Sequence, residues 1–467
     1  MSQRPSLPPH VFMLGIGGIG MSALARHLTH NGHRVAGYDL TPSPVTAALL
    51  SEGIEVVFDP HPEALPSWVV QTPAPDLLLV HTPAVPRDLP LRVWMDSRGI
   101  RPMKRAELLG RITAHHPTLA VAGTHGKTTT SSWLAHILNG TDAGCHAFLG
   151  GIDASTGTNY LSRPGAAWHV VEADEFDRSF HQLHPTHAAI TNLDPDHLDI
   201  YGDARSFREA FEQFGQQVTG TLLLPLDLPW TNSPSSPSVE RFAVGKDLSA
   251  VDGADHQALV GAQGETTFWI HRGTPEEIQF QATPALPGTH NASNALVAAA
   301  LAHKAGVSAE LLATGIAQFG GVKRRMDIHL DTPSGVYVDD YAHHPEELRA
   351  LLSAVRERWP GRHVTLIFQP HLFSRTRDFG AEFAEVLGTT DQLWLLPIYP
   401  AREKPIAGVD AQWLFENISG THKHLSSSET IFTSLKACPV DVLITAGAGD
   451  IDRLVPQAIQ HMQDRSR

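Results

Sequence analysis

The sequence LAVAGTHGKTTT, residues 119–130, is the basis of the fold prediction. An apolar run, Leu119–Ala122, comes before a turn bounded by glycines, and a lysine and three threonines follow. In such a turn between a strand and a helix, backbone N–H groups hold phosphate oxygens, and the lysine reaches the terminal phosphates. We therefore predict a strand, a loop that binds ATP or GTP, and a helix. The predicted loop residues are Gly123, Thr124, His125, Gly126 and Lys127.

The loop is shorter than the general phosphate-binding pattern. Two residues separate Gly123 from Gly126, whereas the general pattern has four. A purely structural turn is the alternative interpretation. If a nucleoside triphosphate binds here, a hydroxyl group of Thr128 or Thr129 is expected to bind its Mg²⁺.

Two further polar segments follow apolar runs in the same region. Residues 172–177 read EADEFD after the run at 169–171. Carboxylates at such a strand end lie near the phosphate loop, and Mg²⁺ takes few carboxylates together with water and phosphate oxygens. Glu172 is therefore a predicted metal ligand, with a solvated acidic loop as the alternative. The second segment, residues 192–199, reads NLDPDHLD after the run at 188–191. Its His197 is either a metal ligand or a loop histidine.

A second glycine-rich turn lies near the N-terminus. Residues 15–20 read GIGGIG after the apolar run Val11–Leu14, and Met21–Asn31 has helical spacing. Glycines there let the backbone approach a pyrophosphate, and Asp39, which ends the next apolar run, can take a ribose hydroxyl. The pattern predicts a site for NAD or another nucleotide diphosphate, with a tight structural turn as the alternative.

The C-terminal part of the chain contains less specific patterns. Asn291 and Asn294 share one helical face and could cap the helix or bind an adenine edge. Residues 339–344 read DDYAHH, but zinc is not expected because a third ligand at a convincing spacing and a nearby cysteine are both missing. Arg375 and Arg377 could bind a carboxylate or a phosphate, or simply lie on the surface.

Apolar runs and helical spacing alternate along the chain, which predicts an α/β fold with parallel sheets. The length of 467 residues corresponds to about three domains. Further strands are expected near the following runs: 35–38, 77–80, 188–191, 222–224, 335–338, 364–368, 393–396 and 442–445. Short strands are expected within 240–283, and helices at 291–305, 346–358 and 376–387.

Composition excludes several classes of protein. Lys and Arg number 35 against 49 Asp and Glu, a net charge of −14, which argues against a nucleic-acid partner. Two cysteines are too few for a disulfide framework and fit a reducing cytoplasm. The longest apolar runs, such as 295–302, are far shorter than a membrane span, and the N-terminus lacks a secretion pattern.

Taken in order, these motifs resemble those of the Mur ligase family, which builds the cytoplasmic peptidoglycan precursor by ATP-dependent amide formation. The resemblance covers nearly the whole chain and implies three domains. These are a Rossmann-like UDP-sugar-binding domain (1–109), a central P-loop ATPase domain with a mainly parallel sheet (110–321), and a C-terminal Rossmann-like α/β domain for the amino acid (322–467). The shortened phosphate loop is normal in this family.

The resemblance also implies a reaction. ATP phosphorylates a substrate carboxylate to an acyl phosphate, an amine attacks, and phosphate leaves. The segment Gln369–Arg377 resembles that of the family branch that joins L-alanine to UDP-N-acetylmuramate. The resemblance also implies that the reaction uses Mg²⁺, or Mn²⁺ in its place. The runner-up is the murein-peptide recycling branch, which attaches a tripeptide to the same UDP-sugar. An NAD-dependent oxidoreductase leaves the Lys127 loop unexplained. A nucleotide-binding regulator without catalysis is disfavoured because Lys127, Glu172 and His197 are all present. Whether the chain is a monomer or a homodimer stays open.

Site residues follow from the resemblance position by position. UDP-sugar-binding residues would be Gly15, Gly17, Gly18, Gly20, Met21, Ser22, Asp39 and Arg105. ATP-binding residues would be Gly123, Thr124, His125, Gly126, Lys127, Thr128, Thr129, Asn291, Asn294, Arg325 and Asp340. The metal ligands would be Thr128, Glu172 and His197. The amino-acid site would comprise Tyr341, His343, His371 and Arg375. The catalytic set would be Lys127, Glu172, His197 and Arg375.

Two departures from the family pattern are visible. Several Mur ligases carry a carbamylated lysine about fifteen residues after the histidine matched by His197. Residues 205–214 contain no lysine, and Glu212 lies at about that spacing, which agrees with the L-alanine-adding branch. Leu372 stands where some relatives have a polar residue, so the amino-acid pocket is expected to differ there.

Overall fold

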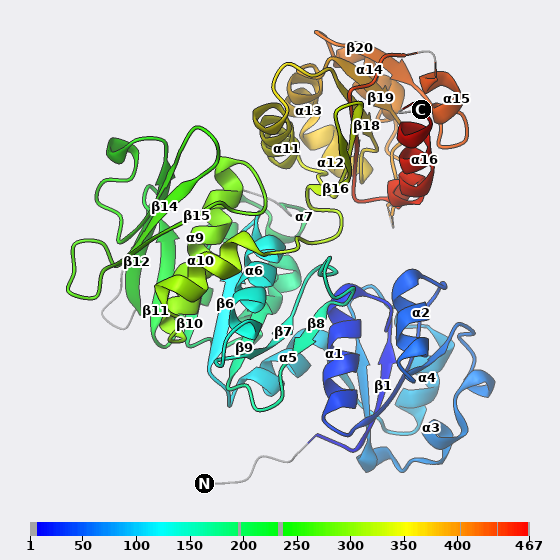
Figure 1. Cartoon of the computed structure of the whole chain (residues 1–467). Coiled ribbons are helices and arrows are strands. Elements are labelled where there is room, and N and C mark those ends of the chain that lie inside the picture. Colours follow the sequence, from blue (N-terminus) through cyan, green and yellow to red (C-terminus); the bar gives the residue numbers. More distant parts are fainter. Residues whose placement is uncertain (1–6, 195–197, 232–236, 402, 437, 466–467) are drawn as a thin grey trace. The chain divides into compact units, whose positions relative to one another are not determined.

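The computed structural model describes residues 7–194, 198–231, 237–401, 403–436 and 438–465 (Figure 1). The described chain forms three sheets, of five, ten and six strands, flanked by helices, which confirms the predicted α/β class. It divides into two compact units, one comprising Met1–Thr283 with Ser293–Phe319 and the other Pro284–Ala292 with Gly320–Arg467. Each range predicted as a domain holds one sheet, and the boundaries themselves stay a prediction.

The first sheet is entirely parallel, in the order β3-β2-β1-β4-β5. Its strands are β1 (His10–Leu14), β2 (Arg34–Tyr38), β3 (Glu55–Val57), β4 (Leu77–His81) and β5 (Pro102–Lys104). Its helices are α1 (Ile19–His30), α2 (Pro44–Ser51), α3 (Ser67–Gln71), α4 (Pro90–Ser97) and α5 (Arg105–Thr113). The strand order reverses between β1 and β4, and ligands of such sheets bind at this switch point. The 15–20 turn follows β1 and therefore lies there.

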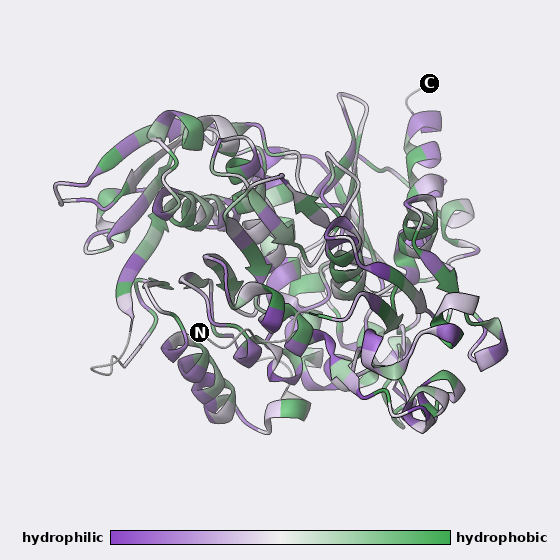
Figure 2. Ribbon diagram, turned by 90° about the horizontal axis from the view of Figure 1, so that it is seen from below, coloured by the Kyte–Doolittle hydropathy of each residue, from purple (hydrophilic) through white to green (hydrophobic). Residues whose placement is uncertain are grey.

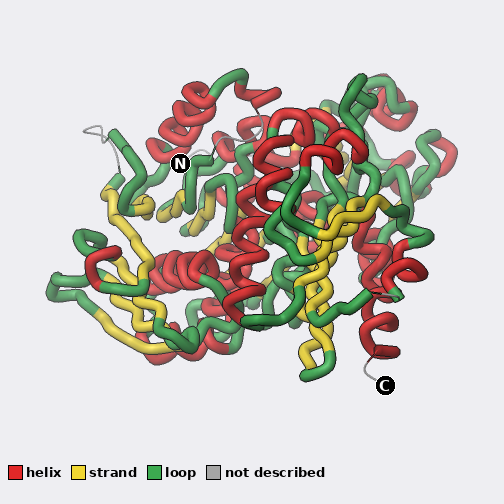
Figure 3. The backbone as a smooth tube through the Cα atoms, turned by 90° about the horizontal axis from the view of Figure 1, so that it is seen from above, coloured by secondary structure: helices red, strands yellow, loops and turns green. Residues whose placement is uncertain are grey.

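Alternate side chains of β1 pack into separate cores on the two faces of this sheet. Val11 and Met13 belong to one buried cluster with Leu24 of α1. Phe12 and Leu14 belong to another cluster, which covers the opposite face. Figure 2 shows hydrophobic residues concentrated in the strands, and Figure 3 shows the strands lying among helices. A strand buried on both faces explains the continuous apolar run that predicted it.

The second sheet is mainly parallel, in the order β15-β14-β13-β12-β11-β10-β6-β9-β7-β8. Its strands are β6 (Thr118–Ala122), β7 (Cys145–Phe148), β8 (Tyr160–Ser162), β9 (Trp168–Glu172), β10 (His187–Ile190), β11 (Thr221–Pro225), β12 (Ser238–Gly245), β13 (His256–Val260), β14 (Thr266–Ile270) and β15 (Ile278–Ala282). Its helices are α6 (Lys127–Asn139), α7 (Leu198–Tyr201), α8 (Ala204–Gln216), α9 (Thr289–Lys304) and α10 (Ala309–Ala317). Strand β6 lies between β9 and β10 and is parallel to both. The carboxyl ends of these three strands therefore meet at one edge of the sheet.

The third sheet has the order β16-β17-β21-β18-β19-β20, with β16 alone antiparallel to its neighbour. Its strands are β16 (Asp327–Thr332), β17 (Gly335–Asp340), β18 (Val364–Phe368), β19 (Gln392–Leu395), β20 (His422–Leu425) and β21 (Val442–Ala446). Its helices are α11 (Pro345–Arg358), α12 (Phe373–Asp378), α13 (Gly380–Leu387), α14 (Ala411–Asn417), α15 (Ile431–Leu435) and α16 (Val455–Arg465). The prediction of one helix over 376–387 was wrong, because Phe379 has φ −113° and ψ 23° and separates α12 from α13.

Short 3₁₀ helices complete the secondary structure. They are η1 (Pro62–Ala64), η2 (Ala74–Asp76), η3 (Phe176–Gln182), η4 (Leu248–Ala250) and η5 (Asp450–Leu454). In the part of the chain that the structure describes, no helix has both the length and the apolar character needed to cross a bilayer.

Candidate functional site

The predicted phosphate loop connects β6 to α6, and its glycines are required by the backbone. Gly123 has φ +125° and Gly126 has φ +81°, a conformation that side chains with a Cβ atom rarely adopt. A Cβ atom at Gly126 would also lie 2.6 Å from Oδ1 of Asn294. Both conformation and space therefore exclude larger residues, as a loop that must approach phosphates requires.

Asn192, which follows β10, holds the loop in this conformation. Its Oδ1 accepts hydrogen bonds from the backbone N–H groups of Thr124, at 2.9 Å, and His125, at 3.0 Å. The hydroxyl group of Thr124 donates to the carbonyl of Asp194 at 2.6 Å. The loop thus rests on the neighbouring strand end rather than on its own residues alone.

Lys127 is the first residue of α6, and its ammonium lies among protein oxygens. Nζ donates to the carbonyls of Gly123 (2.5 Å) and Thr124 (3.1 Å) and to Oε1 of Glu175 (3.0 Å). Burial acts to lower the pKa of Lys127, but the carboxylates of Glu175 and Glu172 outweigh it and raise this pKa. Burial raises the pKa of Glu175 to about 7, against the opposing effect of Lys127.

Oxygen donors suitable for Mg²⁺ lie at the ends of β9 and α6. The β6–β9 register pairs Val121 with Glu172, so Glu172 leaves its strand beside the start of the loop. Its Oε2 accepts a hydrogen bond from the Gly150 N–H at 3.1 Å. Thr128 is buried in the first turn of α6. A carboxylate and a hydroxyl are the oxygen ligands that Mg²⁺ accepts. His197 lies outside the described residues.

The two asparagines at the start of α9 have different contacts. Asn294 accepts a hydrogen bond from the hydroxyl of Thr130 at 3.1 Å, which connects α9 to α6. Asn291 donates from Nδ2 to the carbonyl of Pro287 at 2.7 Å. Both side chains are buried. Their assignment to the adenine stays a prediction.

In the N-terminal domain the predicted UDP-sugar residues gather around the first turn of α1. The Gly17 N–H donates to Oδ2 of Asp39 at 2.8 Å, so this carboxylate orders the glycine-rich turn. A Cβ atom at Gly20 would lie 2.9 Å from Nη1 of Arg105, which places the guanidinium against that turn. Arg105 also pairs with Asp174 at 3.1 Å.

The remaining predicted residues of this turn offer backbone groups. Gly15 has φ +82°, and Gly18 is the N-cap residue of α1. The side chains of Met21 and Ser22 are buried, and the Ser22 hydroxyl accepts a hydrogen bond from Nδ2 of Asn159 at 2.9 Å. A ligand at this helix N-terminus would therefore meet N–H groups rather than these two side chains.

Four residues predicted for the amino acid lie together in the C-terminal unit. The ring centroids of Tyr341 and His343 are 5.1 Å apart, and those of His343 and His371 are 5.8 Å apart. Arg375 donates from Nη1 to Nδ1 of His371 at 3.5 Å. The guanidinium of Arg325 lies 5.1 Å from the Tyr341 ring centroid. Burial lowers the pKa of His343 to about 4, so its imidazole is neutral at pH 7.

Asp340 is the last residue of β17 and directly precedes Tyr341. Its two carboxylate oxygens accept backbone hydrogen bonds from Met326 at 2.6 Å and from Ala342 at 2.7 Å. Burial raises its pKa to about 6. The structure thus shows Asp340 joining the backbone just after Tyr341 to that of Met326, which precedes β16, and its predicted contact with ribose stays untested.

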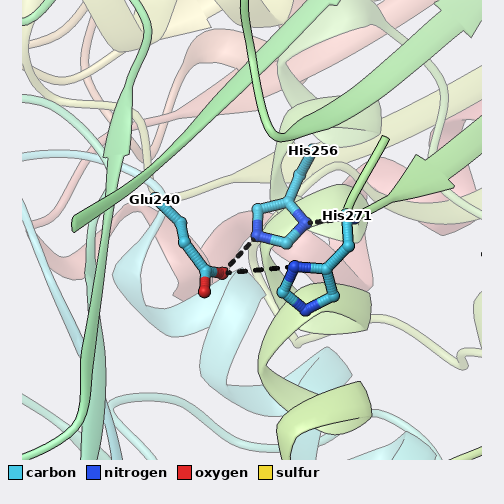
Figure 4. Close-up of side chains that lie close together, drawn as sticks. All are labelled: Glu240, His256 and His271. Carbon is cyan, nitrogen blue, oxygen red and sulfur yellow. Dashed lines mark hydrogen bonds and ion pairs between the residues drawn. The ribbon is translucent and has the colours of Figure 1, made fainter. Parts of the chain in front are cut away.

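A second cluster of titratable groups lies in the central domain, on β12, β13 and the end of β14 (Figure 4). Both imidazoles face one carboxylate oxygen of Glu240, with His256 Nε2 at 2.7 Å and His271 Nδ1 at 4.0 Å. The other oxygen binds Nζ of Lys304, the last residue of α9, at 2.6 Å. Two histidines and a carboxylate can hold a zinc-type ion, so this possibility needs a physical test.

Two features oppose a metal ion at Glu240. Lys304 already places a positive charge on the carboxylate. The His271 N–H donates to Nδ1 of His256 at 3.4 Å, so the ring proton of neutral His256 is on Nε2. That proton faces Glu240, where a metal would need the lone pair. We interpret the cluster as an ion pair reinforced by imidazole, which fixes the C-terminal end of α9 to the strands.

Sequence reasoning missed three residues that order the site. Glu175 lies in the quoted EADEFD segment, and Asn192 follows the apolar run at 188–191, so a strand-end position was the available signal for both. Asn159 had no such signal. Its contact with Ser22 joins residues 137 positions apart in the sequence.

Comparison with known protein families identifies the class of this protein. Three family models match the chain: the Mur ligase family, catalytic domain, at residues 10–117, the Mur ligase middle domain at 121–302, and the Mur ligase, glutamate ligase domain at 324–449. The chain belongs to the Mur ligase family, as its motifs predicted.

Individual relatives and solved structures narrow the similarity to one kind of ligase within the family. The UDP-N-acetylmuramate–L-alanine ligase of Porphyromonas gingivalis is 44% identical over 458 residues, covering 97% of this chain and 99% of the relative. That of Cytophaga hutchinsonii is 44% identical over 453 residues, covering 95% of each. The crystal structure of UDP-N-acetylmuramate-alanine ligase MurC from Thermotoga maritima matches with a TM-score of 0.78 at 26% identity, covering 97% of this chain and 99% of that one. A murein peptide ligase from Psychrobacter arcticus shares the fold, with a TM-score of 0.67 at 23% identity over 97% of this chain and 98% of that one.

Proposed function

We propose that this chain is an ATP-dependent ligase that joins L-alanine to the carboxylate of UDP-N-acetylmuramate and releases ADP and phosphate. The observation that carries the proposal is Lys127, held at the N-terminus of α6 directly beside a glycine loop with two positive-φ residues. The full-length similarity to L-alanine ligases supports these substrates. The reaction belongs to peptidoglycan precursor synthesis, in the cytoplasm.

Each predicted domain supplies one subsite in this proposal. The turn at 15–20 and Arg105 bind the UDP-sugar, because backbone N–H groups and a guanidinium suit a pyrophosphate. The central loop binds ATP. The cluster of Tyr341, His343, His371 and Arg375 binds L-alanine, with Arg375 on its carboxylate. The neutral imidazole of His343 favours this assignment, because it adds no second positive charge that would repel the amino group.

The chemistry has two steps. In the first, the carboxylate oxygen of UDP-N-acetylmuramate forms a bond to the γ-phosphorus of ATP, and the bond to ADP breaks. In the second, the amine nitrogen of L-alanine bonds to the acyl carbon, phosphate leaves with the electron pair of the C–O bond, and the nitrogen releases a proton to solvent. Lys127 orients the terminal phosphate and offsets its charge.

Thr128 and Glu172 are the described residues that would hold Mg²⁺, and their oxygen atoms fit that ion. Bound Mg²⁺ neutralises charge on the phosphate oxygens, and Mn²⁺ can take its place. Glu172 and Thr128 would orient the polyphosphate through this contact. The attacking amine has a free pKa near 8, so its correct placement by the C-terminal cluster contributes more than a dedicated base.

The test is phosphate release with ATP, Mg²⁺ and UDP-N-acetylmuramate, with and without L-alanine, followed by mass spectrometry of the product. We expect alanine-dependent phosphate and a product heavier by one alanine residue. Ligation of the tripeptide L-Ala-D-Glu-diamino acid in place of alanine would assign the chain to the recycling branch. No turnover with either substrate would contradict the proposal, and binding of NAD would then be measured.

A further inference from the structure

Glu175 faces the same ammonium that ATP needs, although it lies 48 positions from Lys127 in the sequence. Its carboxylate comes within 2.9 Å of Nζ, and its side chain is 3% exposed against 13% for Lys127. The backbone carbonyl of Glu175 also accepts a hydrogen bond from the Tyr201 hydroxyl at 2.5 Å. The carboxylate is therefore fixed from both ends, by the loop lysine and by the anchored backbone.

The hydrogen-bonding capacity of Lys127 decides what this contact does. An ammonium has three N–H donors. Those of Lys127 are directed to the Gly123 carbonyl, the Thr124 carbonyl and the Glu175 carboxylate. A phosphate oxygen can therefore bind Nζ only if one of these acceptors is given up. The two carbonyls belong to the loop that forms the phosphate site itself, whereas the carboxylate comes from outside it.

We propose that Glu175 is a positioning residue that holds Lys127 at the phosphate loop and competes with the terminal phosphates of ATP for its ammonium. This inference rests on the proposed function, since it concerns the same nucleotide site. The carboxylate and the phosphate are both anions, so they compete for the same charge and the same N–H donor. Part of the binding energy of ATP is then spent on breaking the Lys127–Glu175 contact.

If Glu175 competes with ATP, removing its charge should increase the affinity for ATP, whereas most substitutions in a binding site decrease affinity. An interaction that must be broken on binding stabilises the free protein, so its loss increases affinity for the ligand. In Glu175→Gln the side chain keeps its size and an acceptor oxygen, but Lys127 loses its nearest counter-charge, while the charges of Glu172 and Asp174 remain. The buried ammonium is then less stable without ATP, and the phosphates become its best partner.

The experiment measures the dissociation constant of ATP with Mg²⁺ by calorimetry, with wild-type protein and with Glu175→Gln. We expect binding to tighten by about fivefold, which corresponds to roughly 1 kcal/mol. Asp177→Asn is the matched control, because Asp177 comes from the same segment but pairs with Lys104 at 3.1 Å. Its affinity for ATP should stay at the wild-type value.

A second comparison separates contact with Lys127 from general effects. In a Lys127→Met background, Glu175→Gln should leave ATP affinity unchanged, because the competing contact no longer exists. Glu175→Asp, which keeps the charge but shortens the side chain, should give an intermediate affinity and serves if Glu175→Gln does not fold.

The outcomes distinguish this inference from the proposed function. Wild-type protein that binds no ATP contradicts the proposed function itself. Wild-type protein that binds ATP, together with equal or weaker binding in Glu175→Gln, overturns the competition. Equal tightening in Asp177→Asn also overturns it, since the cause would then be net charge rather than the contact.

Discussion

Two lysine–glutamate pairs with opposite character lie largely out of solvent among the described residues around the central sheet. Lys127 and Glu175 meet at 2.9 Å beside the phosphate loop, and Lys304 and Glu240 meet at 2.6 Å at the far end of α9. Burial raises the pKa of Glu175 to about 7. Burial also acts to raise the pKa of Glu240, but hydrogen bonds from His256 and Lys304 outweigh it and lower this pKa to about 2.

The difference lies in how deeply each carboxylate is buried and in the charges around it. Glu240 receives Lys304 on one oxygen and His256 on the other, so its negative charge is well compensated. Glu175 is more deeply buried, it pairs with Lys127, whose other donors go to the loop carbonyls, and the nearby Asp174 carboxylate raises its pKa further. The Glu240 pair therefore stabilises the fold, whereas the Glu175 pair holds a lysine that must exchange partners.

The largest expected effect comes from removing each lysine in turn. Lys127→Met should reduce alanine-dependent phosphate release by about 10³-fold, because the positive charge that stabilises the transferred phosphate is lost. UDP-sugar binding, measured by calorimetry, should stay nearly unchanged. Lys304→Met is the control, and its turnover should remain within a few-fold of wild type. Normal turnover in Lys127→Met would contradict the role of this lysine.

The Glu240 pair should instead affect the free energy of unfolding and leave turnover unchanged. Glu240→Gln leaves Lys304 without its counter-charge; breaking a buried pair costs about 3 kcal/mol, and this partly buried pair should lose up to that amount. The denaturant midpoint for unfolding of the compact unit that contains Glu240 should fall accordingly, while the KM for ATP stays constant. A midpoint within error of wild type would show that the Glu240 pair contributes no net stability.

The two carboxylates should also give opposite slopes of stability against pH. The folded pKa of Glu175, about 7, lies above its ordinary 4.5, so the folded protein binds the proton more tightly and this group loses stability as pH rises from 4.5 to 7. The folded pKa of Glu240, about 2, lies below 4.5, so its contribution is complete above pH 4.5 and is lost as pH falls toward 2.

Denaturant unfolding of wild type, Glu175→Gln and Glu240→Gln across this range measures both slopes as differences. Differences are needed because burial lowers the pKa of His27 to about 4 and that of His169 to about 3. Because these histidines are neutral in the folded protein, they reduce its stability as pH falls below 6.5. This effect is the same in every variant and cancels in the comparison. Slopes of the same sign in the two variants would contradict the assignment.

The smallest effect is expected at His256. In His256→Gln the carboxylate of Glu240 keeps Lys304, so the main loss is the 2.7 Å hydrogen bond from His256, worth about 1 kcal/mol, with a smaller part from the long 3.4 Å contact to the His271 N–H. His61→Gln is a suitable control, because His61 pairs with Asp59 on the surface, where its side chain is 62% exposed. Its midpoint should not change. A loss at His256 as large as that in Glu240→Gln would show that imidazole, not lysine, neutralises Glu240.

The sequence predicted the parts of the site that depend on local backbone. Gly123, Gly126 and Lys127 lie in one turn, so their spacing alone indicates the positive-φ loop and the helix start. Glu175 was not predicted as a partner of Lys127, because that contact depends on how β9 leaves the sheet beside β6. The segment itself was visible as acidic, but acidity does not distinguish a metal ligand from a counter-ion.

Long-range packing also explains the other differences. Strand β20 reads HKHL at the sheet edge and lacks the apolar run that identified the buried strands. The aromatic and cationic cluster of the C-terminal unit was assigned by resemblance, and its members come from two segments, around Tyr341 and around His371, which only the folded sheet brings together. Periodicity within either segment contains no information about this contact.

The division of the chain into two compact units has a consequence for synthesis. The first unit includes Ser293–Phe319, which follows a stretch, Pro284–Ala292, that belongs to the second. A chain emerging from the ribosome therefore cannot complete its first unit until residue 319 is out. A fragment ending at 283 would lack both Asn294 beside the phosphate loop and Lys304 beside Glu240. Expression fragments of the nucleotide-binding half should accordingly extend to Phe319.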